Sequence, residues 1–229
     1  MKLAIMQPYF LPYLGYWQLI NAVDQYIVYD NVTYIKGGWI NRNNLLVSGG
    51  KKMFTVSLKG ASSFKLINEI EIGDNFSKLL GLVQANYAKA PYFNDVKKLL
   101  LDMVSFESRV LSEFIANSMR IIMDYLCMDT EILISSSLLL HTEVKGKDKV
   151  IKICEYLGAD TYYNAIGGQE LYSKADFAAH GIELRFLKTI LRPYTQHKCD
   201  FVPGLSILDV LMFNSPRIVN QMLDDYELE

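Results

Sequence analysis

Residues 1–30 read MKLAIMQPYFLPYLGYWQLINAVDQYIVYD, and the order of patterns within them decides the fold. The apolar run 3–6 predicts a short buried strand. The two prolines of the loop 7–12 exclude a helix there, because each pushes the preceding residue to extended geometry. A helical pattern follows over residues 13–23, and a second strand follows over residues 25–29. This order is a β-α-β unit, which predicts a parallel sheet.

Short strands and helices continue to alternate along the rest of the chain. The prediction is one α/β domain over residues 1–229, with an open, mostly parallel, Rossmann-like sheet and a helical insert or flank near 76–127. The predicted strands are 44–47, 52–58, 67–72, 132–135, 161–164 and 182–187. The first two form a hairpin around Ser48-Gly49-Gly50. The predicted helices are 76–89, 92–103, 107–127, 148–157, 169–174, 175–179, 206–213 and 216–223.

Composition limits the partners that the chain can have. Its 229 residues carry a formal net charge of -2, and no basic stripe favours a nucleic acid. No run of about 18 apolar residues predicts a membrane span, and the opening segment lacks the features of a signal peptide. Cys127, Cys154 and Cys199 are far apart and odd in number, so we expect free buried thiols and no zinc site. These features favour the cytoplasm.

Ligands of an open parallel sheet bind beyond the carboxyl ends of its strands. The segments expected at that edge are 7–12, 30–42, 135–147 and 164–169. The first contains Gln7 and Tyr9 and leads into a helix start whose free N–H groups could hold phosphate or carboxylate. A tight connection with aromatic packing is the alternative interpretation of this loop.

The segment 30–42 has the highest density of chemically useful side chains. Asp30 ends a strand, and Arg42 has the fork geometry that binds phosphate or carboxylate through two hydrogen bonds. A turn cap and a surface ion pair are the alternative roles of these two residues. The candidate binding residues of this segment are Tyr34, Lys36, Trp39, Asn41 and Arg42.

Two further segments are weaker candidates. Gly167-Gly168 follows a strand and could bring the backbone close to a ligand, or could be a simple turn. Gln196 and His197 lie in a polar segment, and His197 could act as a general base, with His141 and His180 as alternatives. A thiol–imidazole pair of His197 and Cys199 is disfavoured. No Walker loop, dinucleotide fingerprint, H-E-x-x-H or G-x-S-x-G motif occurs.

One combined pattern extends over nearly the whole chain and consists of Gln7-Pro8-Tyr9, Pro12, Gly15-Tyr16, Asp24, Asp30, Tyr34, Trp39, Asn41-Arg42, Tyr87, Ala90-Pro91-Tyr92-Phe93, residues 157–162, Gly167-Gly168, residues 181–184, Tyr194, Gln196, Pro203 and residues 205–209. This pattern resembles the WbqC-like protein family. Its members are associated with bacterial surface-polysaccharide gene clusters, notably O-antigen synthesis, so the resemblance implies a role in making or decorating a sugar. Many members have His before the Gln-Pro pair, where this chain has Met6.

The leading hypothesis is an acyl or aminoacyl transferase that forms an amide on a nucleotide-linked amino sugar. Arg42 and Lys36 would hold the diphosphate of this small-molecule substrate. Asp30 or His197 would act as general base, and Gln7 or Asn41 would orient the acyl carbonyl.

Two alternatives remain open at this point. The opening segment also looks like that of nucleotidyltransferase folds, in which case Ser135-Ser136-Ser137 and Lys145 or Lys147 could contact phosphate while a carboxylate is adenylated. The His-x-x-His signature of that class is absent. The other alternative is a non-catalytic ligand-binding protein of the same pathway. The sequence leaves the cofactor, the sugar and the acyl donor open, and a homo-oligomer is one option.

Overall fold

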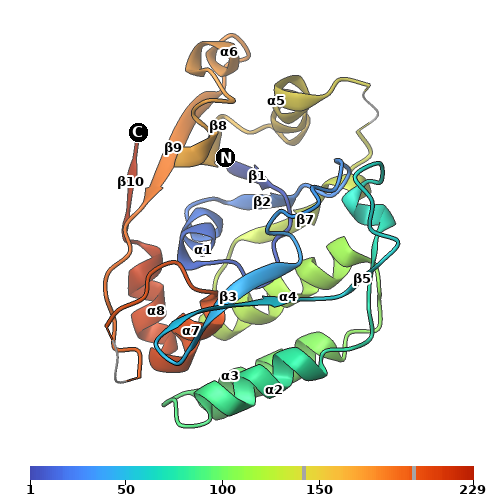
Figure 1. Ribbon diagram of the computed structural model, residues 1–229. Helices are drawn as coiled ribbons and strands as arrows, with labels where there is room; N and C mark the ends of the chain where they lie inside the picture. The colour runs from blue at the N-terminus through green and yellow to red at the C-terminus, as the bar shows by residue number, and fades with distance from the viewer. Residues whose placement is uncertain (141–142, 198–199) are drawn as a thin grey trace.

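A mostly parallel sheet forms the centre of the molecule (Figure 1). The computed structural model describes residues 1–140, 143–197 and 200–229. Within these ranges the largest sheet has the order β10-β9-β8-β1-β2-β7, in which only β10 runs antiparallel. The prediction of an α/β structure with a mostly parallel sheet is confirmed. The strands are β1 (Lys2–Met6), β2 (Gln25–Val28), β7 (Glu131–Ile134), β8 (Thr161–Ala165), β9 (Glu183–Thr189) and β10 (Tyr226–Leu228).

The predicted β-α-β unit is confirmed. β1 and β2 are parallel neighbours, with Leu3 opposite Gln25 and Met6 opposite Val28. From one edge of the sheet, the parallel strands follow one another as β7, β2, β1, β8 and β9. The direction in which successive strands of the chain are added therefore reverses between β1 and β8. All five carboxyl ends therefore meet at one edge, and the segments that follow them leave from it.

Alternation along the strands divides the interior into two cores. Successive side chains of a strand point to opposite faces, so Ala4, Tyr26 and Val28 enter one core while Ile5 and Ile27 enter the other. The first core includes side chains from α1 (Leu14–Asn21), α4 (Leu111–Leu126) and α8 (Pro216–Leu223). The second core includes side chains from α5 (Gly146–Leu157) and α6 (Lys174–Ala178).

The three helices predicted between residues 76 and 127 are present, and Pro91 lies between the first two. They are α2 (Ser77–Tyr87), α3 (Phe93–Val104) and α4. α4 lies against the sheet and α8, while α2 and α3 lie on the far side of α4 from the sheet (Figure 1). The buried side chains of all three belong to the first core, which also contains α7 (Ile207–Phe213).

The hairpin predicted after residue 43 is present but does not join the central sheet. β3 (Arg42–Val47) and β4 (Gly50–Thr55) pair antiparallel as a separate two-stranded sheet, with Asn44 opposite Met53. A second small sheet pairs β5 (Leu58–Lys59) with β6 (Glu71–Ile72).

Several local predictions are wrong. The expected strand over 67–72 is a 3-10 turn at Ile67–Glu69 followed by the two residues of β6. The helix expected over 169–174 is absent, because the chain turns at Ile166–Gly168 and α6 begins only at Lys174. β10 was not predicted, since three residues are too few to show a periodic pattern.

The cysteine prediction is correct for one described residue and wrong for the other. Cys154 is buried, whereas Cys127, the left-handed cap at the end of α4, is exposed. His141 and Cys199 lie outside the described residues. In the ranges that the structure describes, no helix is long and apolar enough to cross a bilayer.

Candidate functional site

A cleft of about 590 Å³ opens at the carboxyl edge of the sheet, between the end of β2 and the start of α5. We call it the β2–α5 cleft. Parallel strands end here and a helix begins here, which is the position where open α/β sheets bind ligands. The cleft is lined by Tyr29, Asn31, Val32, Thr33, Leu66, Glu143, Val144, Lys145, Gly146 and Lys149.

Lys149 provides a positive charge held in a defined position in this cleft. Its Nζ atom donates hydrogen bonds to the backbone oxygen of Asn31 at 3.0 Å and to the side-chain oxygen of Asn31 at 2.8 Å. The same atom lies 5.2 Å from the centroid of the Tyr29 ring, a cation–π arrangement. Burial lowers the pKa of Lys149, and the Asp30 carboxylate opposes that effect. The ammonium group is thus positioned before any ligand arrives.

Asp30 is buried beside the cleft and holds a serine turn. Its Oδ1 atom accepts hydrogen bonds from the Ser135 hydroxyl at 2.9 Å and the Ser136 backbone N–H at 2.9 Å. Its Oδ2 atom accepts from the Ser136 hydroxyl at 2.7 Å, and its own N–H donates to the Ser135 hydroxyl oxygen at 3.1 Å. These bonds fasten the turn that follows β7 to the end of β2. The role of Asp30 as a general base remains a prediction, and this geometry gives its carboxylate a structural task.

The start of α5 adds partial positive charge to the cleft. The helix begins at Gly146, whose φ of 59° lies in the left-handed region, and the preceding Lys145 makes no side-chain cap. Uncapped N–H groups and the helix dipole favour an anion at such an end. Lys145 contributes a second ammonium group to the lining, while Glu143 contributes a carboxylate. This combination suits a ligand with a phosphate group and a neighbouring hydroxyl or ammonium group.

The other predicted residues of segment 30–42 lie outside the lining of this cleft. The Tyr34 hydroxyl donates to the side-chain oxygen of Asn41 at 3.2 Å, and Asn41 donates to the backbone oxygen of Val56 at 2.7 Å. Arg42 donates through Nε to the backbone oxygen of Gly38 at 2.6 Å. Tyr34 and Asn41 are buried, Arg42 is half-buried, and Lys36 and Trp39 are exposed. The structure brings Tyr34 and Asn41 together, but as internal contacts.

The loop after β1 fits the interpretation of a tight connection. Gln7 and Tyr9 are half-buried, the Tyr9 ring stacks on Tyr16 at 5.5 Å, and the Tyr16 hydroxyl donates to the backbone oxygen of Gln7 at 2.7 Å. At the start of α1, a Cβ atom on Gly15 would lie 2.2 Å from the Thr189 hydroxyl oxygen. Protein atoms therefore pack directly against Gly15 in the first turn of α1.

Gly167 and Gly168 follow β8, on the other side of β1 from β2, and neither lines the cleft. Gly167 is exposed, and Gly168 is buried. A Cβ atom at Gly168 would lie 2.9 Å from the Asn164 side chain, so the close approach here is to protein.

Gln196 belongs to a buried cluster centred on Asp209, which we call the Asp209 cluster. Asp209 accepts hydrogen bonds from the hydroxyls of Tyr87 at 2.7 Å and Tyr194 at 2.6 Å, and from the Gln196 amide at 2.8 Å. Burial raises the pKa of Asp209, and these three donors oppose the rise. The cluster ties the end of α2 and the segment after β9 to α7. The exposed His197 lies at its border, with its ring 4.7 Å from that of Phe213.

The residues that build the cleft were only partly accessible from the sequence. Asn31 and Thr33 lie inside the predicted segment, but neither was singled out. Lys149 was missed because it occurs in a lysine-rich helical run, where a solvated face is the ordinary expectation. The residues that the structure describes contain no group of three His, Cys, Asp or Glu side chains arranged to hold a metal ion.

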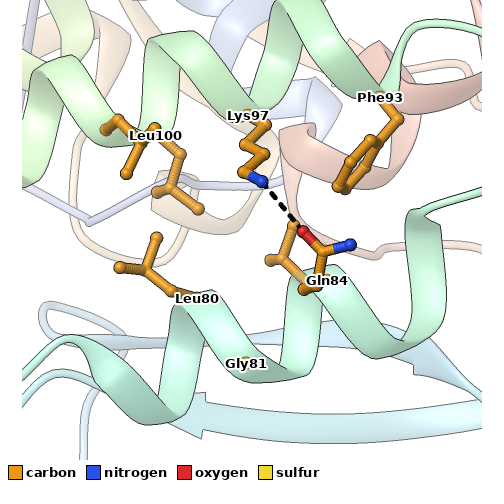
Figure 2. Close-up of a pocket in the computed structure, with 8 residues that line it drawn as sticks. Leu80, Gly81, Gln84, Phe93, Lys97 and Leu100 are labelled. Carbon is orange, nitrogen blue, oxygen red and sulfur yellow. Dashed lines mark hydrogen bonds between the residues drawn. The ribbon is translucent and has the colours of Figure 1, made fainter.

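A second hollow has a different character. A groove of about 260 Å³ lies between α2 and α3. Figure 2 shows Leu80, Phe93 and Leu100 presenting apolar groups to it. Its polar contact is a hydrogen bond of 3.0 Å from Lys97 to Gln84 across the groove. The groove lies away from the carboxyl edge of the sheet and lacks converging polar groups, so the β2–α5 cleft is the better candidate site.

Comparisons with known proteins agree over almost the full length of the chain. The family described as the WbqC-like protein family matches residues 7–221. An uncharacterized protein of Mycobacterium tuberculosis, Rv1507c, is 28% identical over 219 residues, which cover 93% of this chain and 93% of that protein. No solved structure matches the chain.

Proposed function

The chain belongs to the WbqC-like protein family, and from this premise we propose that it is a transferase of bacterial surface-polysaccharide biosynthesis, notably O-antigen synthesis. In this proposal it forms an amide between an acyl or aminoacyl group and the amino group of a nucleotide-linked amino sugar. The nucleotide diphosphate binds in the β2–α5 cleft, which is open to the solvent at the ligand edge of the sheet.

The observation that carries this proposal is the position of Lys149. Its ammonium group is held by two oxygens of the uncharged Asn31 and by the face of Tyr29. A cation fixed in this way, next to Lys145 and the first N–H groups of α5, matches a diphosphate. The sequence predicts Arg42 and Lys36 for this task, but Lys145 and Lys149 line the cleft, so the proposal moves the task to them.

Amide formation requires the sugar amine to lose its proton. The amine nitrogen attacks the acyl carbonyl carbon, the bond from that carbon to the ester or thioester leaving group breaks, and a base takes the proton. Glu143 is the carboxylate that lines the cleft and is our candidate for this base, in place of Asp30 or His197, which the sequence predicts for the role. The sequence predicts Gln7 or Asn41 for orienting the acyl carbonyl, but neither lines this cleft, and the Asn41 amide already bonds to Tyr34 and Val56.

The first experiment measures binding by calorimetry with UDP-sugars, dTDP-sugars, ATP and an acyl-CoA. We expect a nucleotide sugar to bind, and Lys149→Met to weaken that binding roughly ten- to a hundredfold, since a hydrogen-bonded charge is lost. Lys152→Met is the matched control, because Lys152 lies on the same helix and pairs with Glu155 at the surface. Equal affinity of the wild type and Lys149→Met would reject the cleft as the diphosphate site.

A specific observation favours adenylation of a carboxylate as a second candidate function. Lys145, which the sequence predicts as a phosphate contact for this reaction, lines the cleft, and the turn Ser135–Ser137 that follows β7 is held beside it by Asp30. A carboxylate attacking the α-phosphorus of ATP would give an acyl adenylate and release pyrophosphate. Release of pyrophosphate that depends on a carboxylate would support this function over direct acyl transfer. Binding of nucleotide sugar without turnover would instead support the non-catalytic alternative.

A further inference from the structure

Four large apolar side chains are exposed in the loops before β3 and after β5 and on the strand β4. The exposed fractions are 53% for Ile35, 47% for Trp39, 46% for Met53 and 95% for Phe64. We call these four residues the loop patch. Monomeric proteins rarely expose several large apolar groups together without an interaction to serve.

Hydrogen bonds connect the segments that carry the loop patch. The backbone N–H of Tyr34 donates to the backbone oxygen of Lys65 at 2.9 Å, which places the residues beside Ile35 and Phe64 next to each other. Arg42 donates to the backbone oxygen of Gly38 in the turn that carries Trp39. A second nitrogen of Arg42 lies 4.0 Å from the Met53 sulfur. The chain segments that carry the four side chains therefore adjoin one another.

The charge of this part of the chain is one-sided. Residues 31–68 contain no Asp or Glu, although the whole chain has a net charge of -2. Lys59 forms an ion pair with Asp74 at 2.6 Å, whereas the other lysines of this region form no ion pair within the described ranges. The basic residues of the region are Lys36, Arg42, Lys51, Lys52, Lys59 and Lys65.

We propose that the loop patch and its flanking lysines dock the protein on the surface of a bilayer that contains anionic phospholipid. Exposed Trp and Phe side chains lie well at the boundary between headgroups and acyl chains, while lysines keep their ammonium groups among the headgroup phosphates. Each lysine near such a surface contributes to binding through the negative surface potential. Ile35 and Met53 favour a bilayer over single-stranded nucleic acid, because bases stack on aromatic rings and gain little from aliphatic groups.

The docking surface adjoins the β2–α5 cleft. Thr33 and Leu66 pair as an isolated antiparallel bridge and also line the cleft, and the residues next to them in sequence lead directly to Ile35 and Phe64. Docking would bring the cleft close to the headgroup layer. The inference rests on exposure and charge, so it is independent of the reaction proposed above.

Trp39 provides a direct test, because the chain has two tryptophans and Trp17 is fully buried. Fluorescence of the full chain is recorded with vesicles of pure phosphatidylcholine and with vesicles of equimolar phosphatidylcholine and phosphatidylglycerol. We expect a blue shift of the emission with the anionic vesicles, reversed by high salt because salt screens the lysines. An unchanged emission maximum with anionic vesicles would overturn the proposal.

Variants then assign the binding to the patch by vesicle co-sedimentation. Lys36→Gln with Lys65→Gln should weaken binding about fivefold per lysine, the effect typical of one basic residue at such a surface. Ile35→Ser with Phe64→Ser should weaken it at least as much, because both apolar contacts are lost. The matched control is Leu171→Ser with Lys174→Gln, near α6, where Leu171 is 70% exposed. Thermal melts verify that each variant is folded.

Two outcomes of these experiments would contradict the proposal. If the patch variants and the control lost vesicle binding equally, the binding could not be assigned to the loop patch. Binding of a single-stranded oligonucleotide with no sedimentation on anionic vesicles would show that the lysines serve a nucleic acid instead. The proposal is supported if the wild type shows the blue shift, the patch variants bind vesicles more weakly, and the control variant binds them like the wild type.

Discussion

Lys149 donates hydrogen bonds to both oxygens of Asn31, at 2.8 Å to the side chain and 3.0 Å to the backbone, across 118 positions of sequence. The contact holds the first turn of α5 over the end of β2. Asn31 is uncharged, so it orients the ammonium group without neutralising it. Within the described ranges Lys149 forms no ion pair, and its charge is available to a ligand in the β2–α5 cleft.

We expect Lys149→Met to change the free energy of unfolding by less than about 1 kcal/mol at pH 7, because removing a partly buried charge offsets the lost hydrogen bonds. Burial lowers the folded-state pKa of Lys149 below its ordinary value of 10.5. The unfolded chain therefore binds this proton more tightly, and the stability of the wild type relative to the variant should rise as the pH approaches 10.5. Urea denaturation at several pH values measures the difference. A loss of several kcal/mol at pH 7 would show that Lys149 is structural.

Asp30→Ala should destabilise the protein by about 2–4 kcal/mol, since three hydrogen bonds to a buried carboxylate are lost and the serine turn is released. Asp129→Ala, at an exposed position before β7, is the control and should change the free energy of unfolding by no more than about 0.5 kcal/mol. Urea denaturation measures both variants. Unchanged stability combined with loss of turnover would instead assign Asp30 to the general-base role predicted from the sequence.

Gly15→Ala should destabilise the protein by about 1–3 kcal/mol, because the added methyl group would overlap the Thr189 hydroxyl and the Tyr13 ring. The matched control is Gly81→Ala in α2, where an added Cβ meets no atom within 4 Å. That change should stabilise the protein by about 0.5–1 kcal/mol through the higher helix propensity of alanine. Thermal melts of both variants give the comparison. If Gly15→Ala matched Gly81→Ala, the Thr189 and Tyr13 side chains would not be packed firmly against Gly15.

The sheet could be predicted from the sequence because its signals are local. The buried run 3–6, the proline loop and the helix before β2 each show their pattern within a few residues, and chain connectivity then makes the strands parallel. The common ligand edge follows from that arrangement. β10 escaped prediction because its place is set by pairing with β9, and three residues carry no periodicity.

The site was harder to predict because its contacts are not local. Lys149 contacts Asn31 because α5 packs over β2. Asp30 accepts hydrogen bonds from Ser135 and Ser136, which lie more than a hundred positions further along the chain. The polar residues Tyr34 and Asn41 satisfy each other inside the protein. A dense run of polar side chains indicates that a loop is ordered, but it does not reveal whether those groups face a ligand or the interior.

Asp209→Asn tests the buried cluster. The amide nitrogen of asparagine cannot accept the hydrogen bond that one carboxylate oxygen accepts from Tyr87 or Tyr194, so the variant should lose about 1–3 kcal/mol of stability. Asp102→Asn, at an exposed position of α3, is the control and should change stability by no more than about 0.5 kcal/mol.

The pH dependence of the same variant has a defined sign. Burial raises the folded-state pKa of Asp209 above 3.8, so the folded protein binds this proton more tightly than the unfolded chain. The stability that Asp209 contributes is therefore greatest below pH 3.8 and declines as the pH rises through the folded-state pKa. The difference in free energy of unfolding between wild type and Asp209→Asn should therefore become smaller as the pH rises from 3.8 through the folded-state pKa. Urea denaturation at successive pH values measures this difference. A difference that widens with rising pH would mean that the hydrogen bonds from Tyr87, Tyr194 and Gln196 outweigh burial, and that the carboxylate is more stable in the folded protein than in water.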